Sequence, residues 1–202
     1  MASPSRPDGT APRQARRWAL RALLFGAPAA GVGLYMGLLR NGARTRAGPL
    51  RFTMQVEPPL LPELTFNDAA SGPVTLQAWR GKVVLLNIWA TWCPPCVKEM
   101  PSLDRLQEKL GGKDFEVIAL SIDAGTSALT SIRSFYSRVG IRHLKVYHDP
   151  ASKAGFTLGT VGVPTTLLVD RQGRELGRMT GVAEWDGPEA LAFLREQIGR
   201  SG

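Results

Sequence analysis

The sequence predicts an α/β domain built on a mixed β-sheet that is sandwiched by helices. Two almost entirely apolar runs, 83–88 and 117–122, are typical of strands buried on both faces of a sheet. A helical pattern lies between them, and a strand, a helix and a strand at this separation form a right-handed parallel crossover. The chain ends with two strands on a tight turn and then a helix, which adds antiparallel strands to the sheet.

The elements follow in order from residue 62. A turn-rich stretch, 67–73, predicts a hairpin over 64–76. After the strand over 83–88, apolar residues at spacings of three and four predict a helix from about Cys96 to Leu110. The remaining expected elements are a strand over 117–122, a helix over 129–139 closed by Gly140, a short strand over 144–147, strands over 165–170 and 175–180, and a helix over 188–198.

Length, composition and charge exclude several classes of protein. The 202 residues suit one domain with an additional segment. With 22 Gly, 15 Pro and no long polar repeat, the composition excludes collagen-like, coiled-coil and acidic disordered chains. Residues 1–51 hold nine arginines and one acidic residue, Asp8, which accounts for the whole net charge of +8. The rest of the chain has 16 basic and 16 acidic residues. Because the domain is neutral, we expect no nucleic-acid partner.

The basic charge instead flanks a candidate membrane segment. Residues 22–39 carry no charge, and 18 residues of helix span roughly 27 Å, close to the ~30 Å hydrocarbon core of a bilayer. We expect 1–21 to be a basic flank, 22–39 an uncleaved signal anchor, 40–61 a flexible tether and 62–202 the domain. The anchor is expected to lie in a bacterial inner membrane, with the domain in the periplasm. The alternative is a cleaved signal peptide with a small-residue site at 27–29.

Cys93 and Cys96 are the only cysteines, and they lie where a buried strand gives way to a helix. A helix N-terminus lowers the pKa of a thiol, so Cys93 is expected to be reactive and Cys96, one turn further, to face the core. Pro94 and Pro95 suit the first turn, where no helical hydrogen bond is lost. The alternative for this spacing is half of a zinc site completed by His143 and His148, which a long intervening segment disfavours.

Three motifs in order identify a family resemblance over about residues 62–198. They are the run 89–96 (WATWCPPC), Glu99-Met100-Pro101, and 162–166 (GVPTT). Together they resemble the thioredoxin superfamily, and specifically its membrane-anchored TlpA/ResA/CcmG-like thiol:disulfide oxidoreductases. The resemblance implies that Cys93 attacks, that Cys96 resolves and that Pro101 kinks the active-site helix. It also implies a cis peptide at Pro164 and pairing of the Val163 backbone with an extended substrate.

Roles are also expected for the remaining candidate residues. Asn87 stands where thioredoxin has a buried aspartate for proton handling, and Glu99 is expected to take over that task. The alternative for Glu99 is a structural glutamate that complements the helix dipole. Trp92, Pro94 and Pro95 are expected beside the reactive sulfur and, with Val163 and Pro164, to contact the substrate. Trp89 is expected in the core and both histidines on the surface.

The expected activity is reduction of disulfides in exported proteins by dithiol–disulfide exchange. The expected clients are apocytochrome c or a copper-site protein, and a membrane thiol electron donor must keep the pair reduced in an oxidising compartment. We expect no metal and no cofactor beyond the Cys93–Cys96 disulfide. An oxidase direction, a thiol peroxidase with Thr91 beside Cys93, and a copper metallochaperone using both sulfurs and a histidine such as His148 remain alternatives.

Overall fold

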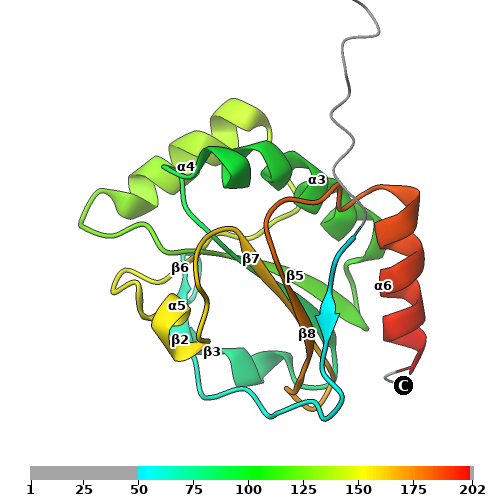
Figure 1. Cartoon of the computed structure of the whole chain (residues 1–202). Coiled ribbons are helices and arrows are strands. Elements are labelled where there is room, and N and C mark those ends of the chain that lie inside the picture. Colours follow the sequence, from blue (N-terminus) through cyan, green and yellow to red (C-terminus); the bar gives the residue numbers. More distant parts are fainter. Residues whose placement is uncertain (1–49, 201–202) are drawn as a thin grey trace, which may run out of the picture. The chain divides into compact units, whose positions relative to one another are not determined.

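The computed structural model describes residues 50–200, which form a mixed β-sheet with packed helices (Figure 1). The strands are β1 Thr53–Met54, β2 Thr65–Asp68, β3 Gly72–Thr75, β4 Val83–Trp89, β5 Phe115–Ser121, β6 Tyr147–His148, β7 Thr165–Val169 and β8 Glu175–Thr180. The helices are the 3-10 helix η1 Leu76–Trp79 and the α-helices α3 Pro94–Leu110, α4 Ala128–Val139, α5 Lys153–Thr157 and α6 Pro188–Arg200.

The described strands lie in the order β1-β8-β7-β4-β5-β6-β2-β3. Strand β4 is central: it pairs in parallel with β5 and antiparallel with β7, which confirms the expected mixed sheet and crossover. Every residue of β4 and β5 is buried, as their continuous apolar sequence predicts. The β4–β7 register places Ile88 opposite Thr165, so the loop before Thr165 lies at the sheet edge from which β4 leads to the cysteines.

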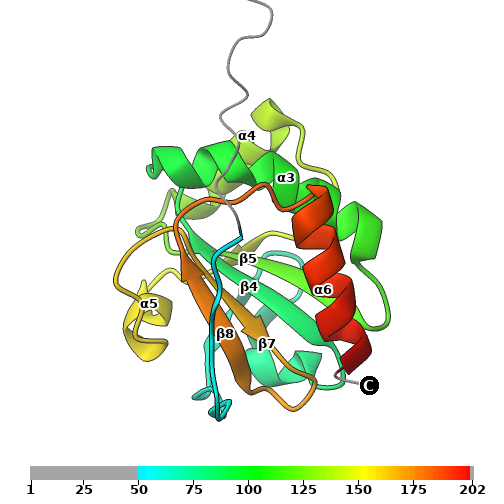
Figure 2. The same cartoon turned by 45° about the vertical axis from the view of Figure 1, so that its right-hand side comes forward.

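Two hydrophobic clusters cover the two faces of the sheet. Residues Val83, Leu85 and Trp89 of β4 belong to the cluster that includes α3, α4 and α6. The intervening side chains of β4 face a second cluster, to which the β2–β3 hairpin, η1 and α5 contribute. The long helices therefore lie on one face and the shorter elements on the other, an arrangement that Figures 1 and 2 show.

Residues 50–61 lie against the domain, whereas the sequence analysis assigned them to the tether. Strand β1 pairs with β8 at the sheet edge, visible in Figure 2. The Phe52 ring stacks on Phe193 with centroids 5.3 Å apart and meets Trp185 edge-on at 6.1 Å. The boundary expected at residue 62 is therefore too late. Pro58 and Pro59 suggested a linker, but the backbone around them pairs with distant residues of β8 that no local pattern reveals.

The expected flank, anchor and most of the tether, 1–49, lie outside the described residues. Within 50–200, no helix has the length and apolar character needed to cross a membrane.

Candidate active site

Cys93 and Cys96 form a disulfide at the N-terminus of α3, with Cα atoms 5.3 Å apart. Cys93 is the N-cap, and its Sγ accepts a hydrogen bond from the Cys96 backbone N–H at 3.2 Å. Pro94 and Pro95 occupy the first helical positions and are exposed, while both cysteines are buried. When the disulfide is reduced, the same N–H group and the helix dipole favour a thiolate on Cys93.

Residues next to the disulfide in the sequence expose apolar side chains. The Trp92 side chain, next to Cys93, is 64% exposed although tryptophan is usually well covered. The Val163–Pro164 peptide bond is cis, as the resemblance implied, and Pro164 is buried. Its carbonyl accepts from the Gly181 N–H, while the backbone of Val163 makes no hydrogen bond to another described residue. The Val163 backbone N–H and C=O therefore remain available to pair with an extended segment of a substrate.

Glu99 lies one turn beyond Cys96 and is only 3% exposed. Its Oε1 accepts from Asn87 Nδ2 at 2.9 Å. Its Oε2 accepts from the indole Nε1 of Trp185 at 3.0 Å and from the Ala183 N–H at 3.3 Å. Burial raises the pKa of Glu99 to about 7, and the hydrogen bonds from Trp185, Asn87 and Ala183 oppose that rise. A carboxyl group with this pKa can release or accept a proton near neutral pH.

This environment differs from the one that the helix-dipole alternative describes. A dipole-complementing glutamate is normally solvated, whereas the contacts of Glu99 are made by residues far away in the sequence. Asn87 also donates to Thr166 Oγ1 at 2.9 Å, so one amide links Glu99 to β7. Its own Oδ1 is buried without a hydrogen-bond partner.

The active-site loop is held by Asp123, which the sequence analysis did not identify. Asp123 accepts from the Thr91 backbone N–H at 2.9 Å and from the Thr91 hydroxyl at 2.6 Å. The hydroxyl is thus directed at Asp123, which weakens the peroxidase alternative that rested on Thr91. The Asp123 carbonyl lies 2.8 Å from His148 Nε2.

The expectation that both histidines lie on the surface is wrong for His148. It is 7% exposed, because β6 is paired on both sides, with β5 and β2. His143 has a half-exposed side chain. Among residues 50–200, no three His, Cys, Asp or Glu side chains gather in a way that would hold a metal ion. Trp89 is fully buried in the core, as expected.

Comparisons with known proteins agree with this geometry. The Redoxin family model matches residues 55–194. The thiol-disulfide oxidoreductase ResA of Bacillus thuringiensis (strain Al Hakam) is 30% identical over 159 residues, which cover 79% of this chain and 84% of that protein. The thiol:disulfide interchange protein HelX of Rhodobacter capsulatus is 34% identical over 127 residues, 61% of this chain and 62% of HelX.

Solved structures show the same fold. The exposed lipoprotein thioredoxin of Streptococcus pneumoniae has a TM-score of 0.56 at 26% identity and covers 67% of this chain and 99% of its own. A DsbF homologue from Corynebacterium diphtheriae has a TM-score of 0.55 at 27% identity, with coverage of 71% and 91%. These likenesses and the disulfide at the helix N-terminus point to thiol–disulfide exchange.

Proposed function

The chain belongs to the Redoxin family and is a thiol:disulfide oxidoreductase, and we propose that it reduces disulfides in exported proteins before haem or copper is attached to them. The observation that carries this proposal is the Cys93–Cys96 disulfide at the start of α3, next to the exposed Trp92. Val163 precedes the cis Pro164 at the sheet edge where β4 ends, and its backbone makes no hydrogen bond to another described residue. The disulfide supplies the reactive sulfur, and the Val163 backbone supplies a place for an extended client.

The proposed reaction is a two-step exchange. In the reduced protein, the Cys93 thiolate attacks one sulfur of the client disulfide and displaces the other as a thiolate, which takes up a proton. The Cys96 thiol then loses its proton and attacks Sγ of Cys93, which releases the second client sulfur as a thiolate that also takes up a proton. The client gains two electrons and two protons, and Cys93 and Cys96 end as the disulfide seen in the structure.

Each nearby residue has a proposed part in this exchange. Trp92, Pro94 and Pro95 form the exposed rim, and Val163 offers its backbone N–H and C=O to the client, with Pro164 beside it. Glu99 accepts the proton from Cys96, since its pKa of about 7 leaves a substantial carboxylate fraction at neutral pH. No metal or other cofactor takes part in these steps.

The direction of the exchange can be tested by the reduction potential of the Cys93–Cys96 couple. We expect a value near that of thioredoxin, about −270 mV, because a reductase must release electrons to its client. The couple is equilibrated with reduced and oxidised glutathione, and the thiols are counted by mass spectrometry after alkylation. A potential above about −180 mV, nearer that of DsbA, would contradict the reductase direction and support an oxidase.

We also propose that residues 22–39 anchor the chain in the inner membrane with the domain in the periplasm, where a membrane thiol donor returns electrons to it. The basic flank and the uncharged segment support this location. Protease added to intact spheroplasts is expected to digest the domain, with a cytoplasmic protein as the protected control. Full protection until the spheroplasts are lysed would place the thiols in the cytoplasm and contradict the proposed clients.

A further inference from the structure

The loop between β8 and α6, residues 181–187, provides two of the three hydrogen bonds to the Glu99 carboxylate. Trp185 donates its indole N–H, and Ala183 donates its backbone N–H, both to Oε2. Trp185 is fully buried and belongs to the same hydrophobic cluster as both cysteines. A tryptophan in this loop therefore reaches the carboxylate that lies one turn from Cys96.

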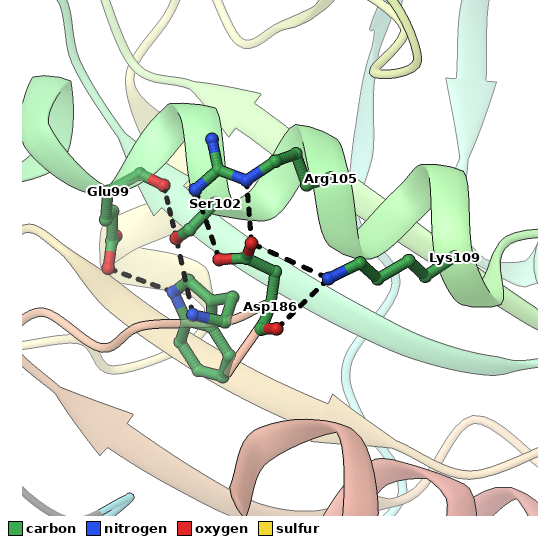
Figure 3. Close-up of polar contacts among 6 residues, drawn as sticks. Glu99, Ser102, Arg105, Lys109 and Asp186 are labelled. Atoms are coloured by element: carbon green, nitrogen blue, oxygen red, sulfur yellow. Dashed lines mark hydrogen bonds and ion pairs between the residues drawn. The ribbon is translucent and has the colours of Figure 1, made fainter. Parts of the chain in front are cut away.

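A second set of contacts fixes the same loop to the outer side of α3. Asp186 forms a two-point ion pair with Arg105, at 2.7 Å to Nε and 3.2 Å to Nη2. Lys109 donates to the Asp186 carbonyl at 3.2 Å. The Ser102 hydroxyl accepts from the Trp185 N–H and donates to the Glu99 carbonyl at 2.7 Å. Figure 3 shows these contacts following one another along α3 from Glu99 to Lys109.

The donors around the carboxylate are uncharged. Asn87 on β4, Ala183 and Trp185 donate to it, and β7 adds the neutral Thr166 behind Asn87. The other ionisable residues on the elements around Glu99 are the N-cap Cys93, then Cys96, Lys98, Asp104, Arg105, Glu108 and Lys109 on α3, and Glu184 and Asp186 in the loop. A hydrogen bond to a charged acceptor is stronger than one to a neutral acceptor, so each donor favours the carboxylate over the acid.

We propose that Trp185, held in place by the Asp186–Arg105 ion pair, is a positioning residue that keeps Glu99 in its carboxylate form beside the disulfide. This inference rests on the proposed function, in which the Glu99 carboxylate accepts the proton of Cys96. The indole N–H of Trp185 donates to the Glu99 carboxylate, so we expect Trp185 to act through Glu99. Without the indole N–H, the buried carboxyl group retains its proton to a higher pH and cannot take up another.

The test compares two buried tryptophans. Trp185→Phe removes the donor and keeps an aromatic ring, while Trp89→Phe is the matched control, since Trp89 is equally buried and its Nε1 has no hydrogen-bond partner. Infrared difference spectra of the oxidised protein follow the C=O band of the protonated carboxyl with pH, and Glu99→Gln assigns the band. Trp185→Phe is expected to raise its midpoint by about one pH unit, with no shift in Trp89→Phe.

The ion pair is tested in the same way. Asp186→Asn is expected to raise the midpoint by a smaller amount, because the loop loses one anchor while the indole remains. Glu196→Gln, which breaks the exposed Glu196–Arg200 pair on α6, is the control and is expected to change nothing. Equal shifts in the two tryptophan variants, or no shift in Trp185→Phe, would overturn the inference.

A second readout separates this inference from the proposed function. The rate at which Cys96 resolves a mixed disulfide is followed against pH by stopped flow. We expect its midpoint to move upward with the infrared midpoint in Trp185→Phe. A moved infrared midpoint with an unmoved rate profile would overturn the positioning role, while client reduction by the unaltered protein would still uphold the proposed function. If the unaltered protein reduces no client, the proposed function fails, and the infrared result still decides whether Trp185 controls Glu99.

Discussion

The Cys96→Ser variant is expected to accumulate a covalent complex with its client, and the Cys93→Ser variant is expected to form none. Cys93 is the N-cap of α3, where backbone N–H groups stabilise a thiolate, whereas Cys96 is fully buried one turn further on. Attack therefore begins at Cys93, and only Cys96 is positioned to open the resulting bond. With a serine at 96, the mixed disulfide has no resolving thiol and persists.

This result is measured on solubilised membranes separated without reductant. A band that disappears on reduction is expected in Cys96→Ser, and mass spectrometry of its partner identifies the client. The double variant with serine at both positions is the matched control for nonspecific complexes. Complexes that form equally well in Cys93→Ser, or in neither single variant, would contradict these roles for the two cysteines.

The second large effect is on the pH dependence of stability. Burial raises the pKa of Glu99 from 4.5 to about 7, so the folded protein binds a proton more tightly than the unfolded chain does. The contribution of Glu99 to the free energy of unfolding is therefore largest below pH 4.5, and it is lost as the pH rises through about 7. A shift of this size corresponds to about 3 kcal/mol of unfolding free energy.

Glu99→Gln is expected to remove this decline. The free energy of unfolding is measured in urea on the oxidised protein at pH 4.5 and at pH 8.5. Its decrease between these two pH values should be about 3 kcal/mol smaller in the variant than in the unaltered protein. Asn87 faces Glu99 with its Nδ2, so a turn of the Asn87 amide that brings its unpartnered Oδ1 to this side would let it accept from the new amide. Glu108→Gln, which neutralises an exposed glutamate on the same helix, is the control. An equal decline in both variants would show that Glu99 does not titrate as the structure indicates.

The sequence was sufficient for the elements whose signal is local. The apolar runs at β4 and β5, the periodic pattern of α3 and the turn-bounded strands at the end each lie within a short window. The structure confirms them, and it adds η1 and the five-residue helix α5, which are too short to show a period. The cysteine pair at the junction of a strand and a helix was predictable for the same reason, because two adjacent elements create that position.

The environment of Glu99 depended on the tertiary structure. Its partners Ala183 and Trp185 lie 84 and 86 residues away, in a loop with no periodic pattern, and only folding brings them together. The same holds for Asp123 behind Thr91, for the burial of His148 between paired strands, and for Phe52 against Trp185. The sequence alone determined which groups exchange electrons, because that requires two sulfurs one helical turn apart. Which group is buried, and with what pKa, was decided by the fold, because desolvation depends on everything packed around a side chain.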